Sequence, residues 1–294
     1  MQINRHGSFY IRNGWPTKII DAVTNDPLIF SPNNELAAVD AIGVGRVMIK
    51  AMRYWSVVIG ITNEERIPQG VVHHLTDLGV QIAEHDPYCQ DNGTLWLLHR
   101  NLARCENEAT AWWWLYNCFD QQIFSKDSFS NAFYLFLQSS GETYTRKTVE
   151  KEFDCLKNTY VSEKAFDVHK ILDEDTVPFL APLSLIQYVG SGTFAKRKPK
   201  AREIPLDVLH YCILADNAEH LAERSEIDLD TLLECDKQVG RYMNLSYSTL
   251  LELLQQLENA GKLTLVNNFG SRYIHLHDEN PDDVLHEYYR GDVR

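Results

Sequence analysis

Apolar residues recur with a helical period near the start of the chain. In residues 46–59 the apolar positions fall on one side of a helix and the basic positions on the other. The apolar set is Val47, Met48, Ala51, Met52, Trp55, Val58 and Ile59, and the basic set is Arg46, Lys50 and Arg53. An apolar segment at 35–42 precedes it, and the turn between the two runs from Gly43 to Gly45. Two helices joined by a short glycine turn predict a helix-turn-helix.

The pattern changes on either side of this unit. Residues 14–23 carry Pro16 in a first-turn position, which predicts a helix before it. Residues 70–84 alternate in part between apolar and polar positions, and residues 94–100 form a short apolar run. Segments of this kind are typical of strands, so the two are expected to form the wing of a winged-helix-like unit.

Residues 106–138 are strongly apolar and aromatic. Trp112, Leu115, Tyr116 and Phe119 recur at helical spacing, which predicts a buried helix, with a platform for stacking bases as the alternative.

Residues 141–161 predict a further helix. Its buried stripe would consist of Val149, Phe153, Leu156 and Tyr160. Its start carries Arg146, Lys147 and Lys151, which fit either a second helix-turn-helix or the exposed charged face that is commoner on soluble helices.

The composition changes again at residues 191–204. Small residues precede five positive charges between Lys196 and Arg202. We expect a basic linker here, which fits either an arm over phosphates or a solvated loop. The linker would divide a helical domain, residues 1–190, from an acidic domain, residues 205–294.

The last segment predicts three helices and a hairpin. The helices are expected at 204–218, 228–240 and 246–263, and the hairpin at 262–277. Ser246 or Ser248 would cap the third helix and Gly261 would end it. That helix offers Glu, Gln and Asn but no Lys or Arg before Lys262, so this winged helix is expected to bind protein or to dimerise. The fold class is therefore mainly α with small β wings, built from helix-turn-helix and winged-helix modules.

Charge divides the chain in the same way. The net charge is −13, but residues 1–60 carry six Lys and Arg against four Asp and Glu, whereas residues 203–294 carry seven against eighteen. The acidic end would repel a phosphate backbone and the first part would not. This asymmetry indicates a bipartite protein, with one end for nucleic acid and the other for a different partner.

Composition excludes several classes of protein. No apolar run is long enough for a membrane span, and the first residues have no secretory signal. The six scattered cysteines are expected to be thiols in a cytoplasmic protein. A phosphate-binding loop and a dinucleotide fingerprint are absent from the sequence, which argues against an ATPase and against a nucleotide cofactor.

Two clusters could carry chemistry. Asp86 and Asp91, with His85 and His99 near in sequence, could hold a divalent cation and activate water, although both aspartates also sit in turn-forming sequences. His6, with Arg5 beside it and Arg12 before Trp15, could form a phosphate-binding or general-base cluster; structural capping is the alternative.

The sequences "RHGSFYIRNGW", "GVGRVMIKAMRYW", "HDPYCQDNGTLWLLH" and "TAWWWLYN", in this order and spacing, resemble the domain-of-unknown-function family numbered 4007. That family includes the SspB proteins of single-strand DNA phosphorothioation systems. The resemblance implies a DNA-nicking component that works beside a cysteine desulfurase, an ATP pyrophosphatase-like protein and an ATPase. The family tends to have an acid after the histidine of the first motif, where this sequence has Gly7.

Together these features predict a DNA-binding phosphorothioation protein, either a metal-dependent nickase or a nicking-associated subunit. The alternatives are a non-enzymatic adaptor that recruits the sulfur-transfer enzymes, or a transcriptional regulator. The expected catalytic residues are Asp86, Asp91, His99 and His6, with Mg²⁺ or Mn²⁺ held by the two aspartates. The expected contacts to double-stranded DNA are Arg5, Arg12, Arg46, Lys50, Arg53, Lys196, Arg197 and Lys198. A homodimer is compatible with this assignment.

Overall fold

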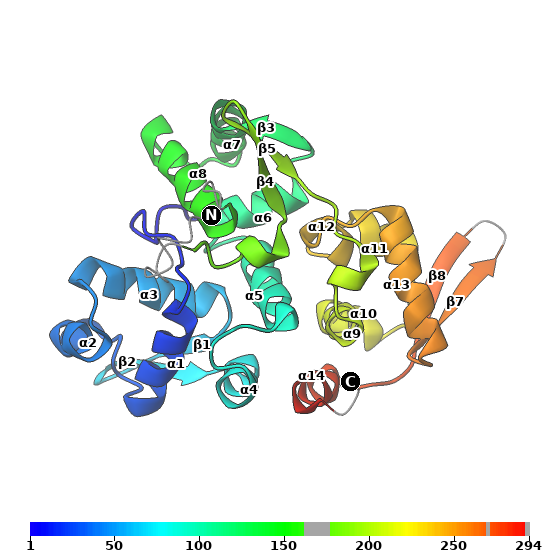
Figure 1. Ribbon diagram of the computed structural model, residues 1–294, viewed down its shortest axis with the longest axis horizontal. Coiled ribbons are helices and arrows are strands. Elements are labelled where there is room, and N and C mark those ends of the chain that lie inside the picture. Colours follow the sequence, from blue (N-terminus) through cyan, green and yellow to red (C-terminus); the bar gives the residue numbers. More distant parts are fainter. Residues whose placement is uncertain (162–176, 269–270, 292–294) are drawn as a thin grey trace, which may run out of the picture. The chain divides into compact units, whose positions relative to one another are not determined.

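The computed structural model describes residues 1–161, 177–268 and 271–291 (Figure 1). They form two compact units, one of residues 1–114 and 121–196 and one of residues 115–120 and 197–294. The predicted class is confirmed at its coarser level, since the chain is mainly α-helical with small antiparallel sheets. Within the described ranges, the helices are all too short or too polar to cross a membrane.

The first part of the chain contains the predicted pair of helices. Its elements are α1 (Trp15–Asn25), a 3₁₀ turn (Pro32–Asn34), α2 (Glu35–Ile42), α3 (Arg46–Val58), β1 (Thr62–Ile67) and β2 (Gly70–Leu75). Gly43 has a φ of 72°, which ends α2, and Gly45 is the N-cap of α3. The predicted buried face of α3 needs one correction. Val47 is 56% exposed, whereas Ile49 and Tyr54 are buried.

The predicted wing is partly wrong. Of the residues expected in the wing, only 70–75 form a strand. This strand, β2, pairs antiparallel with β1. The rest lies in α4 (Asp77–His85) and α5 (Asn92–Arg104). Residues 95–98 of α5 are all apolar and buried, and a short unbroken apolar run cannot be distinguished from a strand by its pattern. Strand β1 has only Thr62 buried, so its apolar pattern is too weak to predict it.

The middle of the chain forms a second group of elements. These are α6 (Thr110–Asn117), β3 (Ile123–Ser125), α7 (Lys126–Ser139), α8 (Arg146–Tyr160), a 3₁₀ turn (Ala181–Leu183), β4 (Ile186–Gly190) and β5 (Thr193–Lys196). The four residues expected at the aromatic helix, Trp112, Leu115, Tyr116 and Phe119, are buried, as is the predicted stripe of α8. Both predictions of core residues are therefore confirmed.

The expected linker at 191–204 is not a loop throughout. Residues 193–196 are strand β5, because Phe194 packs against Phe124 and Phe153 with ring centroids 6.2 and 5.5 Å away. A 3₁₀ turn follows at Ala201–Glu203. The two compact units divide after Lys196, within the segment expected to join them.

The C-terminal unit contains the remaining elements. These are α9 (Leu206–Asp216), α10 (Ala218–Leu221), β6 (Glu226–Asp228), α11 (Leu229–Glu234), α12 (Val239–Tyr242), α13 (Tyr247–Asn259), β7 (Leu263–Asn268), β8 (Ser271–Leu276) and α14 (Pro281–Arg290). Ser246 caps α13 by accepting the Thr249 N–H at 3.1 Å. The helix expected at 228–240 is instead two short helices, since Cys235 leaves the helical conformation. Residues 269–270 of the predicted hairpin turn lie outside the described residues.

Similar orders of elements recur along the chain. Among the described residues, the second group runs helix, strand, two helices, then two strands, whereas the C-terminal unit runs two helices, a strand, three helices, two strands and a last helix. The two sheets have the orders β3-β5-β4 and β6-β8-β7, and in both the first strand pairs with the last. The first group follows the order of the second group, except that a loop replaces the first strand. There the His73 N–H donates to the Pro27 carbonyl at 2.8 Å, and the Val71 N–H donates to the Ser31 hydroxyl at 3.3 Å.

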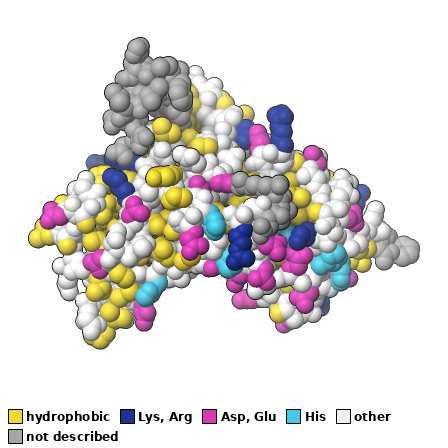
Figure 2. Space-filling model, turned by 60° about the horizontal axis from the view of Figure 1, so that its bottom comes forward, with side chains coloured by type: hydrophobic (Ala, Val, Ile, Leu, Met, Phe, Trp, Pro, Cys, Tyr) yellow, Lys and Arg dark blue, Asp and Glu magenta, His cyan; other side chains and the backbone are white. Residues whose placement is uncertain are grey.

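Acidic side chains gather on the C-terminal unit. On the face drawn in Figure 2, Asp and Glu side chains are concentrated in the right-hand part, which belongs to this unit. The excess agrees with the eighteen Asp and Glu against seven Lys and Arg in residues 203–294. The unit therefore presents a mainly negative surface on that face.

Gly79 offers a test of how α4 packs. A Cβ at this position would lie 2.3 Å from the Ile61 carbonyl oxygen, a backbone atom that cannot swing away. Gly79→Ala is therefore expected to lower the free energy of unfolding by about 1–3 kcal/mol. Gly45→Ala is the control, because its Cβ would meet nothing within 4 Å, and it should cost less than about 1 kcal/mol. Equal losses in chemical denaturation would contradict this packing.

Candidate nucleic-acid interface

The basic face of α3 is exposed but already paired. Arg46 and Lys50 project from successive turns and are 61% and 69% exposed. Both contact Glu35 at the start of α2, with N–O distances of 2.5 and 3.0 Å. The hydrogen bond from Lys50 and the charge of Arg46 lower the pKa of Glu35. The Glu35 carboxylate thus pairs with both Arg46 and Lys50 at the surface, and both cations remain accessible to a phosphate group.

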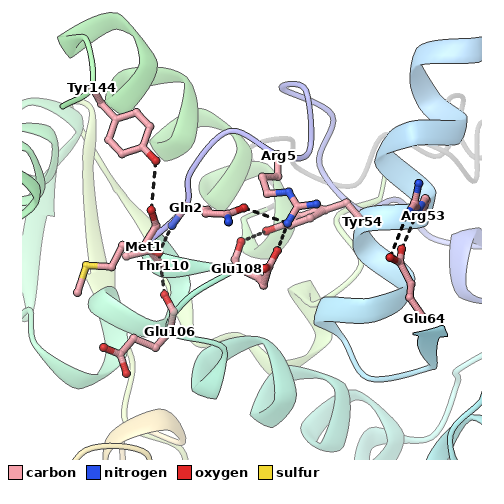
Figure 3. Close-up of polar contacts among 10 residues, drawn as sticks. All are labelled: Met1, Gln2, Arg5, Arg53, Tyr54, Glu64, Glu106, Glu108, Thr110 and Tyr144. Carbon is pink, nitrogen blue, oxygen red and sulfur yellow. Dashed lines mark hydrogen bonds and ion pairs between the residues drawn. The ribbon is translucent and has the colours of Figure 1, made fainter. Parts of the chain in front are cut away.

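Arg53, the third basic residue of α3, has a different setting. It donates two hydrogen bonds to Glu64 of β1, at 2.7 and 2.9 Å (Figure 3). The buried His73 of β2 lies 3.1 Å from the same carboxylate. Burial opposes ionisation of Glu64, but the hydrogen bonds with His73 and Arg53 outweigh it and lower its pKa to about 2. Arg53 therefore joins α3 to the β1–β2 hairpin.

This network predicts a pH dependence of stability. Glu64 stays ionised in the folded protein down to about pH 2, whereas its ordinary pKa is 4.5. Its contribution is therefore complete above pH 4.5 and is lost as the pH falls toward 2. Because the site is partly exposed, we expect roughly 1–2 kcal/mol from this network. Denaturation across this range should show a shallower loss for Glu64→Gln than for the wild type, and parallel profiles would contradict the assignment.

Arg5 and Arg12 lie in the segment before α1. Arg5 pairs with Glu108 and donates to the Gln2 side chain at 2.9 Å, while the Tyr54 hydroxyl donates to the Glu108 carbonyl at 3.0 Å (Figure 3). These contacts fix the N-terminal segment to the loop before α6. The Arg12 guanidinium lies over the rings of Tyr10 and Trp15, each 5.8 Å away.

His6 is fully buried beside Glu152 of α8. The His6 Nε2 lies 3.0 Å from the Glu152 carboxylate, which also accepts the Asn4 N–H at 2.7 Å. The imidazole stacks on Trp55 with ring centroids 6.0 Å apart. This pair ties the first motif of the chain to α3 and α8. A catalytic role for His6 stays a prediction, and its burial favours an indirect one.

Asp86 and Asp91 order the loop between α4 and α5. The two Asp86 carboxylate oxygens accept the N–H groups of Gln90 and Asp91, at 2.8 and 3.0 Å. Asp91 caps α5 by accepting the Gly93 N–H at 2.7 Å. His99 lies inside α5, seven residues after Asn92. It is buried, and its Nδ1 lies 2.8 Å from the Tyr160 hydroxyl. The structure brings the two aspartates together in one loop but places His99 in the core.

A protein-only metal cage is not present at these aspartates. Within the described residues, no group of three or more His, Cys, Asp or Glu side chains could hold an ion. Mg²⁺, however, commonly binds through one or two carboxylates, water and substrate phosphate oxygens. An incomplete site of that kind stays a prediction for these two aspartates.

The three cations expected in the linker have three different environments. Lys196 is only 8% exposed and ends β5. Arg197 pairs with Glu203 at 2.6 Å, and Lys198 is exposed. They therefore do not form one continuous basic arm.

The sequence interpretation missed the carboxylates that pair with the basic residues. Glu35, Glu64, Glu108 and Glu203 each bind a cation that was expected to contact DNA. Glu108 is far from Arg5 in sequence, and Glu35 and Glu64 lie on other elements than the cations of α3, so the way the elements pack decides these pairs.

Comparison with known proteins identifies the family. The family model described as "Protein of unknown function (DUF4007)" matches residues 3–289. A crystal structure of magnesium ion-bound SspB has the same fold with a TM-score of 0.83, and a further SspB crystal structure has 0.82. Each is 23% identical, and the alignments cover 100% of this chain and 89% of the other. No curated protein matches the chain. The chain belongs to the DUF4007 family of proteins of unknown function.

Proposed function

We propose that this chain is a DNA-binding protein of a DNA phosphorothioation system and that it nicks DNA or assists nicking. The observation that carries the proposal is the likeness in fold to SspB over the whole chain, at a TM-score of 0.83. The exposed cations of α3 supply a surface for the phosphate backbone.

In this proposal α1, α2, α3 and the β1–β2 hairpin act as a winged helix, with α3 in the major groove. On binding DNA, Arg46 and Lys50 would leave their ion pairs with Glu35 and pair with DNA phosphates instead. Ion pairs between exposed side chains are weak, so this exchange costs little. Arg53 is the weaker candidate for direct contact, because Glu64 and His73 hold it in a network.

The proposed nick would use a divalent cation, Mg²⁺ or Mn²⁺. One SspB structure is described as magnesium ion-bound. Asp86 and Asp91 are the residues that would hold the cation here, with water and DNA phosphate completing its ligands. When bound, it would polarise the scissile phosphate and favour attack by water. His99 and His6 would then support the loop and the N-terminal segment from the interior.

Incubation of supercoiled plasmid with the full chain and Mg²⁺ or Mn²⁺ tests this activity. The wild type is expected to give open-circular DNA, and Asp86→Asn/Asp91→Asn is expected to give none. Asparagine keeps one carbonyl oxygen, which can accept the Gly93 N–H at position 91 and one of the two N–H groups at position 86, so most of the loop's hydrogen bonds should remain. Nicking by the variant at the wild-type rate would exclude these aspartates. No nicking by the wild type, together with binding of the duplex, would favour the adaptor.

The adaptor is the second candidate, and the acidic C-terminal unit favours it. In this alternative the unit recruits the cysteine desulfurase, the ATP pyrophosphatase-like protein or the ATPase through its negative surface (Figure 2). Binding of these partners in a pull-down that weakens as salt increases would support the alternative.

A further inference from the structure

We infer that α8, with the turn that precedes it, forms a second surface for the phosphate backbone of double-stranded DNA. The inference rests on the proposed function, which assigns DNA binding to the chain but places it on α3. It adds a site at residues 146–151, which lie more than eighty residues further along the sequence.

The recurring order of elements gives α8 the same position as α3. Helices α7 and α8 are joined by a short turn and followed by the β4–β5 hairpin, as α2 and α3 are followed by β1–β2. Helix α7 is capped by Ser125 and α8 by Thr145, which accepts the Thr148 N–H at 3.2 Å. In helix-turn-helix proteins the second helix is the one that contacts DNA.

Three cations lie on the exposed part of α8. Arg146, Lys147 and Lys151 are all exposed, and within the described part of the chain none of them has an ion pair. Lys147 and Lys151 are four residues apart and so share a face. The nearby Asp154 pairs instead with Lys126, at 2.7 Å. DNA must displace Glu35 to reach Arg46 and Lys50. At the cations of α8 it has no carboxylate of a described residue to displace.

The position of these cations is unfavourable for the helix itself. Positive charge in the first turn opposes the helix dipole, and the first turn of α8 contains no acidic residue. Local preferences are commonly violated at functional sites. Arg146 and Lys147 are thus better explained by a bound anion than by the stability of α8.

Helix α13, which directly precedes the β7–β8 pair of strands in the C-terminal unit, shows the contrast. Residues 247–259 contain Glu252 and Glu258 but no Lys or Arg. Of these three helices, each followed by a pair of strands, only α3 and α8 carry the cations that attract phosphate. Both lie in the first compact unit.

Binding of the full chain to a short fluorescent duplex, followed by anisotropy across a range of salt concentrations, tests the inference. The variant is Arg146→Ala/Lys147→Ala/Lys151→Ala. Each lost phosphate contact reduces the salt slope by about 1, so we expect a smaller slope and at least a roughly tenfold weaker affinity. Removal of first-turn cations does not weaken the helix, so the variant should fold. The control, Arg224→Ala/Arg272→Ala/Arg290→Ala, removes the same charge from exposed positions of the acidic C-terminal unit and should bind within about twofold of the wild type.

The outcomes separate this inference from the proposed function. Weaker binding and a smaller salt slope for the α8 variant, with the control unchanged, would support it. Wild-type affinity and slope for the α8 variant would overturn the inference and leave DNA binding intact. An equal loss in the control would also overturn it, because the effect would then come from total charge. If the wild type does not bind the duplex, both this inference and the proposed function are contradicted.

Discussion

Replacement of Glu152 by alanine is expected to lower the free energy of unfolding by about 3–5 kcal/mol. The Glu152 side chain is 1% exposed and accepts from the Asn4 N–H while lying 3.0 Å from His6. Alanine would leave both groups in the interior without this partner, and a buried polar group without a hydrogen bond is costly. Chemical denaturation followed by tryptophan fluorescence measures the loss, since His6 stacks on Trp55.

Glu150→Ala is the matched control on the same helix. Glu150 is only partly buried and has no ion pair with a described residue, so its loss should cost less than about 0.5 kcal/mol. A Glu152→Ala variant as stable as this control would show that the pair with His6 does not hold the N-terminal segment.

Replacement of Phe153 by alanine is expected to cost a similar amount, about 3–5 kcal/mol. Phe153 is buried on α8, and its ring centroid lies 5.2 Å from that of Phe129 and 5.5 Å from that of Phe194. These contacts hold α8 against α7 and the β3-β5-β4 sheet. Alanine would leave a cavity at the point where the three meet.

Measurements of DNA binding distinguish the loss of packing in Phe153→Ala from the loss of charge in the α8 variant. Phe153→Ala should weaken DNA binding only near its lowered unfolding temperature, whereas the α8 charge variant should weaken binding at every temperature. Phe153→Leu keeps much of the buried volume and should lose clearly less stability than the alanine variant. Equal losses for leucine and alanine would show that the site does not depend on packing volume.

The sequence could predict the helices that bury one face. Helices α3, α8 and α13 show their apolar period clearly, and the Ser246 cap and the glycine turn at 43–45 follow from local chemistry. Helix α5 was mistaken for a strand, because residues 95–98 form a short unbroken apolar run that suits either kind of element. Strands β1 and β6 bury too few side chains to reveal their alternation.

The repeated topology is also hidden from the sequence. The turn before α3 uses Gly43 and Gly45, but the turn before α8 contains a different set of residues, from Ser140 to Thr145. In the first group a loop that includes Pro27 and Ser31 replaces a strand. Equivalent positions of the groups therefore make similar contacts with different types of residue. The groups are related by the order of their elements in space and not by a shared residue pattern.

The candidate site was predictable in its cations but not in their partners. The spacing of Arg46, Lys50 and Arg53 correctly placed all three away from the core of α3. The ion pairs that distinguish them, Glu35 with two cations and Glu64 with the third, depend on how α2 and β1 fold against α3. Spacing also could not show that His99 lies in the core.

We expect this acidic chain to bind DNA through the cations of its first unit. Equilibrium binding of the full chain to duplex DNA between ~50 and ~200 mM salt tests this most directly. The chain should bind at low salt, with an affinity that falls linearly with salt on logarithmic axes. The slope should be smaller for Arg46→Ala/Lys50→Ala. No binding at ~50 mM salt, or an affinity independent of salt, would contradict it.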